Sequence, residues 1–170
     1  VKKGVFSQLN DIAKEGAVLA SNTSYLDIDK IASATDRVGD VIGLHFFSPA
    51  NIMRLLEIVV PTNVKDDVVA TGFQLAKILK KVPVRAGNCD GFIGNRVLEN
   101  YAKAANYMME DGTSPYDIDK AIVEFGYPMG PFQMFDLAGG DIGWADRKRK
   151  AAFRSNEERY VSIADRICEK

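Results

Sequence analysis

Apolar residues in the first half of the chain recur at two different spacings. Over residues 5–13 they return every three or four positions, which is typical of a helix with one buried face, and Gly16 follows as a stop signal. Elsewhere they form short runs rich in aliphatic and aromatic residues, which predict buried strands. The predicted helices are 5–13, about 27–34 and 64–80, and the predicted strands are 17–21, 40–47 and 55–61.

From about residue 90 onward only helical spacing remains. Apolar residues three or four positions apart over 93–108 predict a long helix with this stripe as its buried face, beginning at Asp90 as N-cap and ending near Gly112. The further predicted helices are 114–126, 131–139 and 158–170.

The stretch between these two halves, residues 81–87, suits a short edge strand or a connector. Pro83 has no backbone N–H to donate, which argues against a central strand. The sequence therefore predicts an α/β part followed by an all-α part, with the boundary at residues 84–90. We place the two domains at 1–86 and 87–170.

Charge and cysteine content exclude several kinds of partner. The chain carries 22 basic and 23 acidic side chains, so neither nucleic acid nor a membrane surface is an expected partner, and the short basic cluster 147–150 is expected to be a solvated helix or loop. Cys89 and Cys168 match no metal or disulfide spacing, so no metal is expected. No apolar run reaches the roughly 18 residues of a membrane span, and no signal peptide is evident. The expected location is the cytoplasm or an organelle matrix, and secretion is not expected.

Two residues of the segment 43–60 carry candidate chemistry. His45 is the only histidine of the chain, and twelve residues later Glu57 stands in the apolar run LLEIVV. A buried carboxylate is costly unless a cation or a hydrogen-bond donor meets it, and a turn through residues 49–54 would bring His45 to it. Paired in this way, Glu57 would fix the tautomer of the ring and leave the other ring nitrogen as a general base toward a hydroxyl. The alternative is a histidine with a purely structural role.

Two further polar features are candidates for ligand contacts. The motif SNTS, residues 21–24, follows a predicted strand, where α/β sheets place ligand-binding loops, although an ordinary capping loop has the same composition. Asn95 lies near the start of the predicted long helix. Its amide could donate to a substrate oxygen, or it could bond to nearby backbone instead.

Four motifs follow one another along the chain: ASNTSYLDI, GLHFFSPANIMRLLEIV, PV followed by DGFIGNR, and GYPMGPFQMFDLAG. Together they resemble the L-3-hydroxyacyl-CoA dehydrogenase family, and the similarity weakens only after about residue 145. HFFSP, where single-function members have HFFNP, and DLAGGDIGW are more similar to the dehydrogenase part of the multifunctional fatty-acid oxidation enzymes. The resemblance implies the C-terminal part of a Rossmann-type NAD domain over 1–86, and the first repeat of a helical dehydrogenase domain over 87–170.

The resemblance also implies an activity and residues that carry it. The family oxidises an L-3-hydroxyacyl-CoA to the 3-ketoacyl-CoA with NAD. By matching position, His45 would be the general base on the 3-hydroxyl and Glu57 its orienting partner. Ser24 would hydrogen-bond the substrate, and Asn95 would contact the reacting oxygen or the adjacent carbonyl.

For the cofactor, the resemblance points to Lys2, Ser24 and Ser48. Ser48 replaces the usual asparagine, so a contact from its shorter hydroxyl would run through water. The family's Gly-x-Gly-x-x-Gly turn, which holds the NAD pyrophosphate, is missing, since the glycines within 139–143 lie late and follow no predicted strand. We expect the chain alone to bind NAD poorly and to turn over no acyl-CoA, whereas the parent protein does both.

The helical half has implied partners, and two other functions stay open. In the family these helices close the substrate cleft and pack in a homodimer or against a second helical repeat; without that repeat, part of the stripe over 93–108 would be exposed. One alternative is an NAD-dependent dehydrogenase for a small hydroxy acid, which would want a basic residue that HFF does not offer beside His45. The other is a catalytically silent assembly module, which would need no buried acid facing the only histidine.

Overall fold

The computed structural model describes residues 1–169, and this part of the chain forms two compact units. The first unit comprises Val1–Arg96, and the second begins at Val97. The first unit combines strands and helices, whereas the described part of the second contains only helices. The predicted fold class, an α/β part followed by an all-α part, is therefore confirmed.

The first unit is built around a mixed sheet of four strands in the order β1-β2-β3-β4. β1 and β2 are parallel, β2 and β3 are antiparallel, and β3 and β4 are parallel. The three strands predicted in the first half are confirmed, and the stretch around Pro83 is an edge strand. The strands are β1 Leu19–Ser21, β2 Val41–Phe46, β3 Leu55–Val60 and β4 Val82–Gly87.

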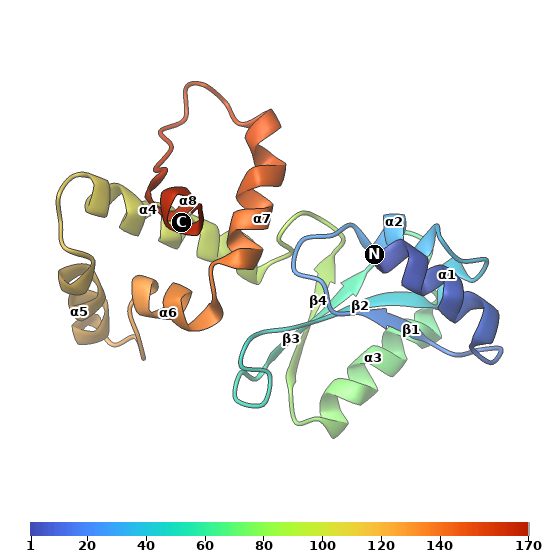
Figure 1. Cartoon of the computed structure of the whole chain (residues 1–170). Helices are drawn as coiled ribbons and strands as arrows, with labels where there is room; N and C mark the ends of the chain where they lie inside the picture. The colour runs from blue at the N-terminus through green and yellow to red at the C-terminus, as the bar shows by residue number, and fades with distance from the viewer. Residues whose placement is uncertain (170) are drawn as a thin grey trace. The chain divides into compact units, whose positions relative to one another are not determined.

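Helices cover both faces of this sheet (Figure 1). α1 (Lys2–Ile12) and α2 (Ile28–Ala32) pack into the hydrophobic cluster on one face, and α3 (Asp66–Ile78) packs into the cluster on the other. Because both faces are covered, β2 and β3 are buried and apolar along almost their whole length. His45 and Glu57 are the two polar residues of these strands.

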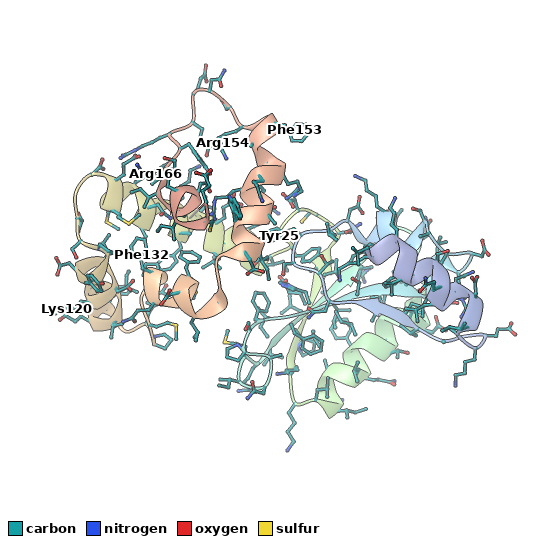
Figure 2. The ribbon with its side chains drawn as sticks, viewed as in Figure 1. Tyr25, Lys120, Phe132, Phe153, Arg154 and Arg166 are labelled. Carbon is teal, nitrogen blue, oxygen red and sulfur yellow. The ribbon has the colours of Figure 1, made fainter. Side chains whose placement is uncertain are left out.

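The second unit is held together partly by a buried acid between two of its helices. The carboxylate of Asp119 accepts hydrogen bonds from the backbone N–H of Phe132 and of Gln133, each at 2.9 Å, and so caps the start of the following helix; Figure 2 labels Phe132. The helices are α4 Gly94–Glu110, which begins in the first unit, α5 Pro115–Phe125, α6 Pro131–Ala138, α7 Asp141–Lys150 and α8 Ile163–Cys168, with short 3-10 helices at Val38–Asp40 and Ala151–Phe153.

The predicted start of the long helix at Asp90 is wrong. α4 begins at Gly94, because Gly91 and Phe92 have φ angles of 72° and 48°. These angles lie in the left-handed region, which a right-handed helix cannot contain. The chain therefore turns before the helix begins, and this turn brings its first amides to the site described below.

The apolar stripe of α4 is more exposed than a core face would be. Val97 is 68% exposed and Met108 is 44% exposed, whereas Ala105 is the buried residue of this helix. The prediction that this stripe is a buried face is therefore wrong for these positions, and the other expectation, that part of the stripe is exposed, agrees with them.

Two helices near the C-terminus differ from the prediction. The basic cluster 147–150 forms the last turn of α7, a helix that was not predicted because its sequence has no apolar stripe. Cations are favourable at that end of a helix, since the last carbonyl groups carry partial negative charge. α8 begins at Ile163 and not at residue 158. Among residues 1–169, no helix combines the length and the apolar character needed to cross a membrane.

Candidate active site

His45 and Glu57 meet across the antiparallel pair β2 and β3. They are direct partners in the strand register, and the ring Nδ1 lies 2.6 Å from the carboxylate Oε2. His45 is 3% exposed and Glu57 is fully buried. The pairing expected from the sequence is confirmed, and it is made by the turn between the two strands.

The second oxygen of Glu57 is held by backbone amides at the start of α4. Oε1 accepts the N–H of Ile93 at 2.9 Å and the N–H of Gly94 at 2.8 Å. Burial by itself raises the pKa of Glu57, but the hydrogen bonds from His45 and from these two amides outweigh it and hold the pKa below its usual range. The buried carboxylate is therefore ionised at neutral pH. These donors could not be predicted from residue types, because every residue except proline carries a backbone N–H.

An ionised Glu57 decides which tautomer of His45 is present. An ionised carboxylate can only accept hydrogen bonds, so Nδ1 carries the ring proton and donates a hydrogen bond to Oε2. Nε2 is then the ring nitrogen with a free lone pair, and within residues 1–169 it has no hydrogen-bond partner. The arrangement is that of a general base oriented by an acid.

Aromatic rings and a glycine enclose the pair. The ring centre of His45 lies 4.5 Å from that of Phe47 and 5.5 Å from that of Phe92. A Cβ added to Gly94 would lie 2.6 Å from the Cζ atom of Phe47, which is closer than real contacts allow. Only glycine at this position lets the start of α4 approach both the Phe47 ring and the carboxylate.

Ser24 and Asn95, the other two predicted catalytic residues, also lie together. The side-chain Nδ2 of Asn95 donates to the backbone oxygen of Ser24 at 3.3 Å. Both are half-buried, and the Ser24 hydroxyl and the Asn95 Oδ1 have no hydrogen-bond partner within residues 1–169. Figure 2 labels Tyr25, which follows Ser24 in this loop. Asn22 of the same loop accepts the Phe46 N–H at 3.1 Å, which ties the loop to the strand that carries the histidine.

The remaining predicted cofactor residues, Lys2 and Ser48, both lie in the first unit, outside its strands. Lys2 is half-buried in the first turn of α1, and Ser48 is exposed just after β2. In the described part of the chain, no hydrogen bond or ion pair joins either residue to His45, Ser24 or Asn95. Their roles at the cofactor stay predictions.

The chemistry of these side chains fits part of a dinucleotide. The hydroxyls of Ser24 and Ser48 can each donate and accept, and neither makes a hydrogen bond within residues 1–169. Residues 1–169 contain no Gly-x-Gly-x-x-Gly turn between a strand and a helix, which is the usual pyrophosphate site. They also contain no group of histidine, cysteine, aspartate and glutamate side chains placed to hold a metal ion.

Two family models match the chain over almost its full length. Residues 1–89 match the model described as 3-hydroxyacyl-CoA dehydrogenase, NAD binding domain. Residues 91–170 match the model described as 3-hydroxyacyl-CoA dehydrogenase, C-terminal domain.

Similar proteins and structures agree with these matches. The peroxisomal bifunctional enzyme of Cavia porcellus is 46% identical over 180 residues, which cover 99% of this chain and 25% of that enzyme. The chain thus spans about a quarter of the length of this curated relative. The crystal structure of FadB2 from M. tuberculosis has a TM-score of 0.89 at 34% identity, covering 99% of this chain and 61% of that one. The (S)-3-hydroxybutyryl-CoA dehydrogenase PaaH1 from Ralstonia eutropha has a TM-score of 0.87 at 30% identity, with 99% and 60% covered.

Proposed function

Because the chain belongs to the 3-hydroxyacyl-CoA dehydrogenase family, we propose that it supplies the catalytic base for oxidising an L-3-hydroxyacyl-CoA to the 3-ketoacyl-CoA in fatty-acid β-oxidation. The single observation that supports this most directly is the buried contact of 2.6 Å between His45 Nδ1 and Glu57 Oε2. It leaves one basic nitrogen, Nε2, without a partner in residues 1–169. A hydroxyl group is the substrate such a base suits.

In the proposed step, His45 Nε2 removes the proton of the 3-hydroxyl while the C3–H bond breaks and the C3–O bond becomes a carbonyl. NAD, when bound, supplies the acceptor for the hydride that leaves C3. The imidazolium formed at His45 then faces the ionised Glu57, which stabilises its positive charge. The proton lost and the hydride lost account for the two hydrogens removed from the substrate.

Other residues of the chain have proposed contacts with the ligands. Ser24 and Asn95 are joined by a hydrogen bond, so we propose that the Ser24 hydroxyl and the Asn95 amide both contact a polar oxygen of the acyl-CoA substrate. For NAD we propose contacts from Lys2, Ser24 and Ser48. For Ser24 and Ser48, the proposal is supported by hydroxyl groups that make no hydrogen bond within residues 1–169. For Lys2, it is supported only by the resemblance to the family.

The setting of the reaction is also a proposal. We place it in an organelle matrix such as that of the peroxisome, because relatives with similar sequences carry peroxisomal or glyoxysomal names. For the exposed apolar stripe of α4 we propose packing against a second helical repeat or a second copy of the chain.

An assay in the reverse direction tests the proposed function. The intact parent protein that contains this chain, which is the protein for every kcat measurement, would be mixed with acetoacetyl-CoA and NADH. The loss of NADH absorbance would be followed, and we expect turnover with the CoA ester and little with free acetoacetate. Turnover of free acetoacetate alone would favour a hydroxy-acid dehydrogenase, and no turnover of either would contradict the proposal. In parallel, calorimetric titration of the 170-residue chain with NAD would measure directly how tightly these residues bind the cofactor.

A further inference from the structure

Two loops flank the His45–Glu57 pair without belonging to the sheet. Residues 22–27 follow β1 and carry Ser24, whereas residues 88–93 lead from β4 to α4 and end at the amides that hold the carboxylate. The ladders of strand hydrogen bonds stop before both loops. The individual bonds that each loop makes therefore decide where it lies.

Asn88 binds the two segments together with both ends of its side-chain amide. Its Nδ2 donates to Asp27 Oδ1 and to Asp29 Oδ2, each at 2.7 Å. Its Oδ1 accepts the backbone N–H of Ile28 at 3.0 Å. An asparagine amide has two donor hydrogens and an acceptor oxygen, so both kinds of group are used here. The two carboxylates repel each other, and the shared amide offsets that repulsion.

The second loop is also fixed further along. Phe92 is 1% exposed in the core, with its backbone in the left-handed region, and Asn95 donates to the backbone oxygen of Ser24 at 3.3 Å. Residues 89–91 alone separate Asn88 from Phe92. Because this connection is short, a shift of Asn88 is expected to move the backbone amides of Ile93 and Gly94 as well.

We propose that Asn88 is a positioning residue for the catalytic pair. By clamping the second loop to the first, it presents the amides of Ile93 and Gly94 to Glu57. Glu57 in turn orients the ring of His45. The effect on turnover rests on the proposed function, whereas the effect on the two amides rests on the geometry alone.

Asn88→Ala and Thr62→Val form a matched pair for the test. N88A removes the clamp. T62V removes a different bond of the same network, from Thr62 Oγ1 to Asp29 Oδ2 at 3.0 Å, and leaves the contacts of Asn88 in place. The first readout is the hydrogen exchange of the Ile93 and Gly94 amides, measured by NMR on the 170-residue chain. The second readout is kcat of the parent protein carrying each substitution, with acetoacetyl-CoA and NADH, alongside the unfolding free energy of each variant.

In N88A we expect the two amides to exchange roughly tenfold faster, because the loop opens locally. We expect kcat to fall by roughly tenfold or more, because a misplaced base is costly. T62V should change neither, even if it lowers stability by as much as N88A does. Unchanged exchange in N88A, or equal changes in both variants, would overturn the positioning role and leave Asn88 as a contributor to stability only.

If N88A does not fold, the substitutions Asn88→Asp and Asp27→Asn provide a second test of the positioning role. Asn88→Asp places a third carboxylate beside Asp27 and Asp29, and it should speed exchange as N88A does. Adding Asp27→Asn restores an amide–carboxylate contact, so exchange and kcat should return most of the way. If the double variant behaves like N88D alone, the clamp is not what matters.

The two proposals can fail separately. A wild-type parent protein without turnover, alongside the expected exchange differences in the 170-residue chain, would remove the proposed function and keep the positioning role. Wild-type turnover with unchanged exchange in N88A would do the opposite.

Discussion

Glu57 is fully buried, and its Oε2 lies 2.6 Å from Nδ1 of His45, its direct partner in the strand register. The other carboxylate oxygen accepts two backbone amides, so the charge is balanced by three donors. Such a carboxylate is a fixed, ionised acceptor, and it leaves His45 with one defined free nitrogen.

Replacing His45 by glutamine should cut kcat by the roughly 10²–10⁴-fold that a lost general base costs. The glutamine side chain can still donate to Glu57, so the fold should survive. The measurement is steady-state turnover of acetoacetyl-CoA with NADH by the parent protein, with thermal unfolding as the control for folding. A well-folded H45Q variant with nearly wild-type kcat would show that His45 is not the base.

Replacing Glu57 by glutamine should invert the tautomer of His45. The glutamine oxygen would accept the amides of Ile93 and Gly94, so its NH₂ group would face Nδ1 and force the ring proton onto Nε2. The base would then be blocked, and kcat should fall roughly 10²–10⁴-fold with the size of the side chain unchanged. Nitrogen NMR of the imidazole reports the tautomer directly. If Nε2 stays unprotonated in E57Q, this explanation of the pair is wrong.

Stability should depend on pH through Glu57. Its pKa in the folded state is lowered from the ordinary value of 4.5. A lowered folded pKa stabilises the protein above the unfolded value, and this contribution is lost as the pH falls from about 4.5 through the folded pKa. Urea unfolding of wild type and E57Q over a series of pH values should show their stability difference shrinking on acidification. A difference that stays constant across this range would contradict the prediction.

Replacing Gly94 by alanine should disturb the pair from the helix side. The new Cβ would lie 2.6 Å from Phe47 Cζ, and overpacking of this kind costs about 1–3 kcal/mol. Because the amide of Gly94 holds Glu57, kcat should fall as well. The matched control is Gly4→Ala in α1, where a Cβ meets nothing within 4 Å, so it should raise the unfolding free energy by about 0.5–1 kcal/mol. Chemical unfolding and kcat of both variants check the contrast; equal behaviour would contradict it.

Much of the fold could be predicted from the sequence. Apolar spacing predicted the strands of the first unit and the helices from α1 to α6, because burial of one face or of both faces imposes a period on the sequence. α7 could not be predicted in this way, since its exposed, charged surface imposes no apolar period. The start of α4 was also hidden, because Phe92 adopts a left-handed backbone that its residue type disfavours.

The candidate site also has contacts that the sequence predicts and contacts that only the tertiary structure shows. The sequence by itself determined that His45 and Glu57 belong together, because an acid in an apolar strand needs a partner and the chain has one histidine. Only the tertiary structure decided which backbone amides complete the carboxylate, and that Asn95 reaches Ser24 and Asn88 reaches Asp27. The amide donors are common to nearly all residues, and these contacts join positions 36 to 71 residues apart. Neither a backbone donor nor a contact between distant positions can be recognised from residue type or spacing, so these contacts are determined only when the chain folds.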